Sequence, residues 1–263
     1  MRADNGTRGK LPIAFVSAAA CCSLVWIFLA TGDRDALTVY CAAGQAEPIS
    51  VLAERYRQQY DVDVRLQFGG TGTLISQVTV ARRGDLLITA DRHSMRVLEE
   101  RAVVADVIEF ARHYPVIAVR IGQPVTFSSL QELKRSGLRV AIGNPQAASI
   151  GKATRAALGD RWDPFRKSVT TMKPTVTEIA MDVQLGAVDA AIVWNSTIPQ
   201  FEGLRAVRLP ELDRHAETIA AGILSDSREP VEARRFARYL TDTEANRRLL
   251  ARYKLDLIVG DGS

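Results

Sequence analysis

The sequence is poor in cysteine. It has 3 Cys in 263 residues, and Cys21 and Cys22 both lie in an apolar run near the amino terminus. Cys41 is therefore alone in the rest of the chain, where no internal disulfide can form. Cys41 precedes a predicted helix, a position that favours a thiolate, but no sequence nearby marks a histidine partner. We interpret it as a small core residue, so the fold must be held by its hydrophobic core.

The sequence also lacks a complete catalytic or nucleotide-binding motif. The segment Gly151-Lys152-Ala153-Thr154 is similar to the end of a phosphate loop, but Gln146 stands where that motif needs glycine. Residues 69–72 lack the spacing of a dinucleotide-binding turn. Three histidines show no metal-ligand spacing, and we interpret each as a surface or capping residue: His93, His113 and His215. We therefore expect no catalytic residues, no resident metal and no cofactor, and hence a protein that is not an enzyme.

Neither charge sign dominates. There are 34 Lys and Arg against 30 Asp and Glu, a net charge of +4, and the two signs are interspersed. Such a distribution is typical of a solvated surface and not of a nucleic-acid-binding stripe. We expect no nucleic-acid partner. The length fits one large domain or two lobes of roughly 100 residues each.

The amino terminus carries an export signal. Arg2, Arg8 and Lys10 precede an apolar run at 11–30, and polar residues follow it at 31–35. The run has the length of a bilayer span, about 20 residues, while Ala30-Thr31-Gly32 offers a small-residue cleavage site. We assign residues 1–35 to a signal peptide or a membrane anchor and leave both alternatives open. In either case we expect the folded part to lie outside the cytoplasm, because the positively charged residues before the apolar run stay on the cytoplasmic side.

From residue 37 the chain alternates short apolar runs with amphipathic stretches, which predicts an α/β fold with mostly parallel sheets and crossover helices. No internal repeat, low-complexity tract or long linker interrupts this pattern. Predicted strands lie at 37–41, 62–68, 85–88, 114–120, 138–142, 189–194 and 218–224. Predicted helices lie at 47–60, 74–82, 94–101, 129–135, 149–158, 176–185, 230–240 and 243–253. The alternation of predicted strands and helices begins again near residue 114, which indicates two lobes.

Four strand-to-helix loops are rich in small and hydroxyl-bearing residues. They lie at 41–45, 69–73, 143–151 and 173–177. Ligands of such sheets bind beyond the carboxyl ends of strands, where free N–H groups and the positive end of the helix dipole suit an anion. Small residues let the backbone approach a ligand closely. Hydroxyl donors are available at Thr71, Thr73, Ser149, Thr175 and Thr177.

Trp194 ends a predicted apolar strand, and two interpretations stay open for it. The indole packs in the core, or it borders the ligand cleft and donates through its N–H.

At these loops the chain resembles the molybdate-binding proteins of ABC importers, which are type II periplasmic solute-binding proteins. The similar segments lie at 37–43, 68–77, 84–91, 115–119, 140–145 and 185–194 and in a tail from 236 to 253. The resemblance implies two lobes that close on a tetrahedral oxyanion held by neutral hydrogen bonds. It places lobe 1 at 36–114 plus 217–263 and lobe 2 at 115–216, with crossover strands near Tyr114 and Thr218.

The resemblance also implies a ligand-binding set. Carried over by position, the family's serine contacts fall on Gly44 and Thr71, its backbone contacts on Ile150 and Val176, and its cleft tyrosine on Trp194. Gln45, Gly72 and Ser149 complete the predicted set. Three of these positions depart from the family: Gly44 has no hydroxyl, Ile150 replaces a small residue, and Trp194 is bulkier than tyrosine. Gln45 is the neighbour that could compensate for the missing hydroxyl.

The expected function is therefore that of an extracytoplasmic receptor of an ABC importer. Its ligand would be molybdate or tungstate, with another oxyanion or a small carboxylate as alternatives, and its partner a membrane permease. We expect a monomer. Two other classes stay open: a membrane-tethered sensory or adaptor domain, and a hydrolase or transferase of similar build.

Overall fold

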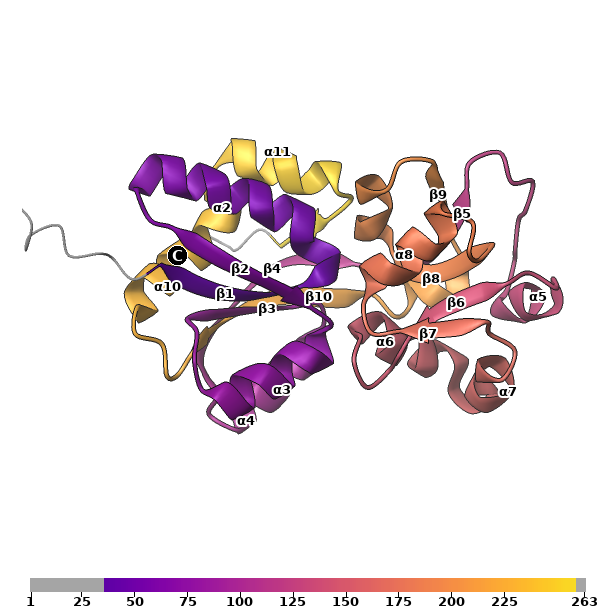
Figure 1. Ribbon diagram of the computed structural model, residues 1–263, viewed down its shortest axis with the longest axis horizontal. Coiled ribbons are helices and arrows are strands. Elements are labelled where there is room, and N and C mark those ends of the chain that lie inside the picture. The colour runs from indigo at the N-terminus through magenta and orange to yellow at the C-terminus, as the bar shows by residue number, and fades with distance from the viewer. Residues whose placement is uncertain (1–35, 259–263) are drawn as a thin grey trace, which may run out of the picture. The chain divides into compact units, whose positions relative to one another are not determined.

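The computed structural model describes residues 36–258, which form two β-sheets flanked by helices (Figure 1). The predicted signal peptide or anchor at 1–35 lies outside this range, as do residues 259–263. None of the helices formed by residues 36–258 combines the length and the apolar character that crossing a bilayer requires.

The first sheet has six strands in the described residues, in the order β11-β4-β10-β3-β1-β2. They are β1 (Leu37–Ala42), β2 (Val64–Gly69), β3 (Leu86–Thr89), β4 (Val104–His113), β10 (Glu217–Leu224) and β11 (Asp256–Leu257). β1 pairs in parallel with β2 and β3, whereas β10 runs antiparallel to both β3 and β4. The sheet is therefore mixed, because the strand that returns from the other sheet enters it in the opposite direction.

Helices cover both faces of this sheet, and the alternation of β1 explains how. Leu37, Val39 and Cys41 point to one face and pack with α2 (Ala46–Tyr60), α10 (Pro230–Asp242) and α11 (Glu244–Arg252). Tyr40 points to the other face and packs with α3 (Thr71–Ala81) and α4 (Arg92–Glu100). Successive strand residues face opposite sides of a sheet, so one short apolar strand supports two helical layers.

The second sheet has five strands in the described residues, in the order β7-β6-β8-β5-β9. They are β5 (Pro115–Arg120), β6 (Val140–Gly143), β7 (Thr171–Lys173), β8 (Ala190–Trp194) and β9 (Leu204–Val207). The helices around it are α5 (Leu130–Arg135), α6 (Ser149–Leu158), α7 (Trp162–Arg166), α8 (Val176–Gln184) and α9 (Pro210–Asp213), with 3₁₀ turns η2 (Gly159–Arg161) and η3 (Asn195–Gln200). β5 is antiparallel to both β8 and β9, so this sheet is mixed as well.

The chain passes between the sheets twice. β4 ends at His113 and β5 begins at Pro115, and the return passes from α9 to β10. Asn195 braces the first passage: the Tyr114 N–H donates to its Oδ1 at 2.9 Å, and its own N–H donates to the Tyr114 carbonyl at 2.9 Å. The predicted lobe boundaries at 114/115 and 216/217 fall between the two sets of strands and stay a prediction.

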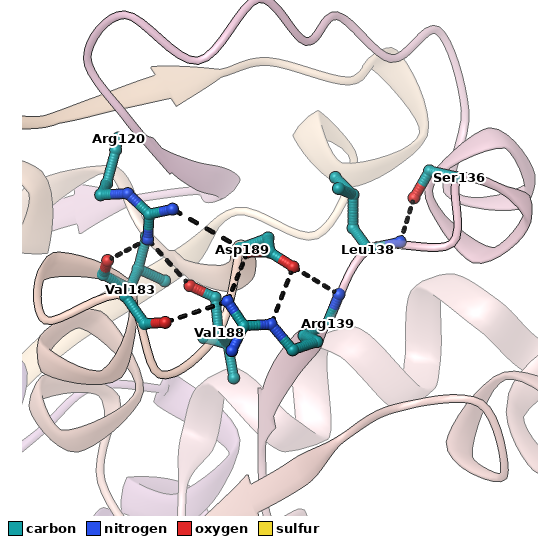
Figure 2. A network of polar contacts seen from close by, with 8 residues as sticks. Arg120, Ser136, Leu138, Arg139, Val183, Val188 and Asp189 are labelled. Carbon is teal, nitrogen blue, oxygen red and sulfur yellow. Dashed lines mark hydrogen bonds and ion pairs between the residues drawn. The ribbon is translucent and has the colours of Figure 1, made fainter.

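A polar network at the α8–β8 turn holds the second sheet together (Figure 2). The Asp189 carboxylate accepts from the Arg139 guanidinium at 2.7 Å and from the Arg139 backbone N–H at 2.9 Å. Arg120 donates to the carbonyls of Val183 and Val188 at 3.0 and 3.1 Å. These bonds anchor the carboxy-terminal end of α8 and the turn that follows it, and so fix the position of β8 between β5 and β6.

The predicted α/β, two-lobed fold class is confirmed, but the expectation of mostly parallel sheets is wrong. β10 in the first sheet and β5 in the second run against their neighbours, so antiparallel pairs are at least as frequent as parallel ones in both sheets. Several elements were also not expected from the sequence. The long strand β4 and the short strands β7 and β9 were not expected. Helix α3 begins at Thr71, three residues before its predicted start, which brings Thr71 and Gly72 into its first turn.

Candidate functional site

A small cavity lies where helix starts from the two sheets meet. The 3₁₀ turn η1 (Ala43–Gln45) and α3 approach it from the first sheet, and α6 and α8 from the second. Its lining residues are Ala42, Ala43, Gly44, Gly69, Gly70, Thr71, Ala90, Ala148, Ser149, Ile150, Val176 and Trp194, and its volume is about 10 Å³.

The cavity brings together most of the predicted ligand-binding set. Gly44, Thr71, Ser149, Ile150, Val176 and Trp194 all line it, while Gln45 and Gly72 lie just beyond the lining. Whether these residues bind a ligand stays a prediction; that they gather around one space is an observation.

Helix α6 presents free backbone donors at this space. The first N–H groups of a helix have no partner inside it. In α6 the N–H groups of Gly151 and Lys152 donate back to the Ala148 carbonyl, and no acceptor within residues 36–258 faces the N–H groups of Ser149 and Ile150. Such N–H groups at the positive end of a helix dipole are suited to an anion.

Thr175 fixes the start of α8. Its side chain accepts from the Glu178 N–H at 3.2 Å, and the Glu178 carboxylate accepts from the Thr175 N–H at 3.0 Å. This capping box leaves the first helical residue, Val176, facing the cavity.

Thr71 is the hydroxyl-bearing residue on the first-sheet side of the lining. Its side chain is 2% exposed, and its Oγ1 accepts from the Ala90 N–H at 3.4 Å. Because that bond uses an oxygen lone pair and leaves the hydroxyl proton free, Thr71 can still donate into the cavity.

Gly70 and Gly72 let the two sheets' loops touch. The Gly72 N–H donates to the Ala147 carbonyl at 2.8 Å. A Cβ on Gly72 would lie 2.2 Å from the Gln146 oxygen, and one on Gly70 would lie 2.3 Å from the Pro174 oxygen. Any side chain at either position would collide with backbone, so glycine is required for this approach.

At Gly44 the close neighbour is a side chain and not backbone. A Cβ there would lie 2.9 Å from Val176 Cγ1 and 3.7 Å from Trp194 Cδ1. The serine that the resemblance implies at this position would need Val176 to move. The tight contact is therefore with Val176, whereas Trp194 Cδ1 would lie at an ordinary van der Waals distance.

Charged side chains are missing from the lining formed by residues 36–258, although one lysine bridges the sheets close by. Lys152 Nζ on α6 donates to Ser94 Oγ at 2.7 Å and lies 3.9 Å from the Asp91 carboxylate. Lys152 therefore links α6, beside the second sheet, to α4, beside the first. Burial, and then the charge of Asp91, raise the pKa of Glu217 to about 7.

Gln45 and His113 form a buried polar group behind Trp194. The Gln45 amide N–H donates to Ser196 Oγ at 3.4 Å, and His113 stacks on the indole with ring centroids 3.8 Å apart. The interpretation of His113 as a surface or capping residue is wrong, because its side chain is wholly buried. Burial lowers the pKa of His113 to about 3.

Cys41 lies in the core of the first sheet, as the sequence indicates. Burial raises the pKa of its thiol, which makes it a poor nucleophile. Among residues 36–258, no three His, Cys, Asp or Glu side chains gather closely enough to hold a metal ion.

Sequence reasoning located most of the remaining lining through its loops and missed Ala90. Ala42, Ala43, Gly69, Gly70 and Ala148 lie in or directly beside the predicted loops. Ala90 follows β3 and has a plain apolar side chain that marks no site. The signal that could have found it is its place directly after a buried parallel strand.

Known proteins of similar sequence are binding proteins. The molybdate-binding protein ModA of Mycobacterium tuberculosis is 27% identical over 226 residues, which cover 84% of this chain and 84% of that protein. A putative binding protein of Haemophilus influenzae is 25% identical over 199 residues, covering 75% and 81% of the two chains. The resemblance to molybdate-binding proteins is therefore confirmed.

Comparisons with solved structures and with family models agree with this similarity. The periplasmic molybdate-binding protein of Azotobacter vinelandii superposes with a TM-score of 0.72 at 18% identity, covering 85% of this chain and all of that one. Residues 37–253 match the family of bacterial extracellular solute-binding proteins. These relatives bind solutes and are not enzymes, in agreement with the expectation for this chain. From residue 37 to residue 253, the chain belongs to the bacterial extracellular solute-binding protein family.

Proposed function

We propose that this protein is the extracytoplasmic receptor of an ABC importer and that it binds a tetrahedral oxyanion, molybdate or tungstate, between its two lobes. The observation that carries the proposal is the cavity where α3, α6 and α8 begin. Its lining offers neutral N–H and O–H donors from both sheets.

Neutral donors suit this task. Removing an anion from water is costly unless fixed donors replace the lost hydration. The N–H groups of Ser149 and Ile150 and the hydroxyl of Thr71 come from opposite sides, so an anion between them would tie the lobes together. Without Lys or Arg in contact, selectivity would come from size and donor geometry.

The size of the cavity sets a condition on binding. About 10 Å³ is the space of roughly one water molecule, too little for four oxygens around a metal. Val176 and its neighbours in the lining must therefore shift to admit the ligand, while Gly72 stays against Gln146 and Ala147 in the closed form. Hinge movement at the two passages between the sheets would let the ligand enter, and a ligand would favour the form that it fits best.

Thermal unfolding tests the proposed ligand class. A ligand that binds only the folded protein stabilises it by about 2.7 kcal/mol at one hundred times its Kd. For a protein of this size that is a rise in Tm of about 5–10 °C. We expect the rise with molybdate and tungstate, and not with sulfate, phosphate or small carboxylates. A rise with one of the latter would replace the ligand; no rise with any of them would refute the oxyanion site.

The site itself is tested at Thr71. Thr71→Ala removes the hydroxyl from the lining, and we expect molybdate to bind about 10- to 150-fold more weakly, the effect of one lost hydrogen bond to a charged group. Thr73→Ala is the matched control, since Thr73 is exposed on the same helix. Equal affinity of Thr71→Ala and Thr73→Ala would show that the anion binds elsewhere.

The same family membership supports the proposed partner and state. A receptor of an importer delivers its solute to a membrane permease, and a bilobal receptor can do so as a monomer. Light scattering would detect a dimer, and genes for a permease beside this one would support transport over sensing.

A further inference from the structure

His113 is a buried side chain with hydrogen-bond partners at both ring nitrogens, and it lies behind the cavity wall. It is the last residue of β4, directly before the passage to the second sheet, and its side chain is wholly buried. Its Nε2 lies 3.0 Å from the Ala90 carbonyl oxygen, and its Nδ1 lies 3.1 Å from Ser196 Oγ. A carbonyl only accepts, so Nε2 carries the proton; in the neutral ring Nδ1 then accepts from the Ser196 hydroxyl.

This assignment gives every hydrogen bond in the group a direction. The Gln45 amide donates to Ser196 Oγ, Ser196 donates to His113, and His113 donates to the Ala90 carbonyl. Gln45, His113 and Ala90 belong to the first-sheet side and Ser196 to the second. The imidazole ring is therefore fixed in its plane by bonds at both nitrogens, from both sides of the passage.

The fixed ring supports Trp194. The imidazole and the indole are nearly parallel, at 11°, with centroids 3.8 Å apart. Trp194 lines the cavity, and its Cδ1 lies 3.7 Å from the point that a Cβ on Gly44 would occupy. The indole is thus backed by His113, and its plane forms one wall of the space beside Gly44, with Val176 as another.

We propose that His113 is a positioning residue for selectivity: by holding the indole of Trp194 in one plane, it sets the width of the cavity and so the size of the oxyanion that fits. The inference rests on the proposed function, since it concerns the same cavity. The ring acts through Trp194 and does not touch the ligand. Because burial keeps it neutral, it adds no attraction for anions in general, and discrimination by size is preserved.

Three variants separate stacking from hydrogen bonding. His113→Leu removes the stacking and both hydrogen bonds of the ring. His113→Phe keeps a flat ring and removes both hydrogen bonds. Ser196→Ala keeps the stacking and removes the donor to Nδ1 together with the acceptor of the Gln45 amide. His215→Leu is the matched control, since His215 makes none of these contacts. The readouts are the ratio of the Kd for sulfate to the Kd for molybdate, and the near-ultraviolet circular dichroism of Trp194, taken as the difference from Trp194→Phe.

We expect His113→Leu to lower the sulfate-to-molybdate ratio by about ten-fold or more, the scale of discrimination by pocket shape. His113→Phe should lower it less, with part of the indole signal retained, and His215→Leu should leave both readouts unchanged. A ratio within two-fold of wild type in folded His113→Leu would overturn the proposal. If His113→Leu fails to fold, Ser196→Ala is the test. A lowered sulfate-to-molybdate ratio in that variant supports the proposal, and an unchanged ratio overturns it.

Failure of the proposed function is distinguishable. If the wild-type protein binds neither anion, the oxyanion assignment falls while the positioning role is still measured by the dichroism. An unchanged Trp194 signal in His113→Leu would then overturn it.

Discussion

Replacing Gly72 by alanine should separate the stability of the protein from its ability to close. Gly72 lies in the first turn of α3, where glycine is a poorer helix residue than alanine by up to about 1 kcal/mol. In a form with the lobes apart, the added methyl group meets only solvent and its own helix. Gly72→Ala should therefore unfold at the same Tm as wild type, or up to about 3 °C higher, without ligand.

In the closed form, where the loops of the two sheets touch, Gly72→Ala should be destabilising. The new Cβ would lie 2.2 Å from the Gln146 carbonyl oxygen, which is backbone and cannot rotate away. Overpacking of this kind costs about 1–3 kcal/mol, and loss of the hydrogen bond from Gly72 to Ala147 costs about 1 kcal/mol more. Since these losses fall on the closed form alone, the Kd for molybdate should rise by about 30-fold or more.

Titration calorimetry and thermal unfolding together test this reasoning. Thr73→Ala is the control, because it changes the same turn of the same helix at an exposed position. The reasoning fails if Gly72→Ala binds molybdate as tightly as Thr73→Ala does. It also fails if weaker binding comes with a marked fall in Tm, since the substitution would then damage the fold itself.

Three further predictions concern pH and stability. Because the pKa of Glu217 is raised, the folded protein keeps a proton between pH 4.5 and about 7 that the unfolded chain has already released, and the free energy of unfolding falls as pH rises through this range. Urea unfolding should therefore show Glu217→Gln to be more stable than wild type by about 1–2 kcal/mol at pH 8 and equally stable at pH 4.5. The Arg139 guanidinium lowers the pKa of Asp189, so Asp189→Asn should lose about 1–2 kcal/mol at pH 7, and the difference should shrink as pH falls below the usual value of 3.8. The lowered pKa of buried His113 means that wild type loses up to about 1.4 kcal/mol per pH unit below pH 6.5 towards about 3, and His113→Phe should flatten that part of the stability profile.

The sequence predicts the alternating elements well where apolar periodicity is clear. β1 and α2 follow from an apolar run and an amphipathic stretch, and the structure shifts their bounds by one residue. β4 escapes such reasoning because Asp106, Glu109 and Arg112 interrupt its apolar pattern. These charges lie at partly or fully exposed positions of the strand; Asp106, for example, accepts from Arg234 at 2.8 Å.

The candidate site could likewise be predicted only in part. Its lining follows from loops at strand ends, since the topology of an α/β sheet brings those ends together. The role of His113 could not be predicted, because its partners Ala90 and Ser196 are 23 and 83 residues away. The bridging contact of Lys152 with Ser94, 58 residues away, depends likewise on how two sheets meet.

The position of β10 has a consequence for the order in which the protein is made. β10 lies between β3 and β4 and pairs with both, yet it begins more than one hundred residues after β4 ends. As the chain leaves the ribosome, β3 and β4 therefore appear without their common neighbour, while residues 115–207 supply every strand of the other sheet in one stretch. Contacts between distant segments form slowly, so the first sheet stays unfinished until residues 217–257 emerge. The part of the chain that is made first is therefore among the last to become rigid.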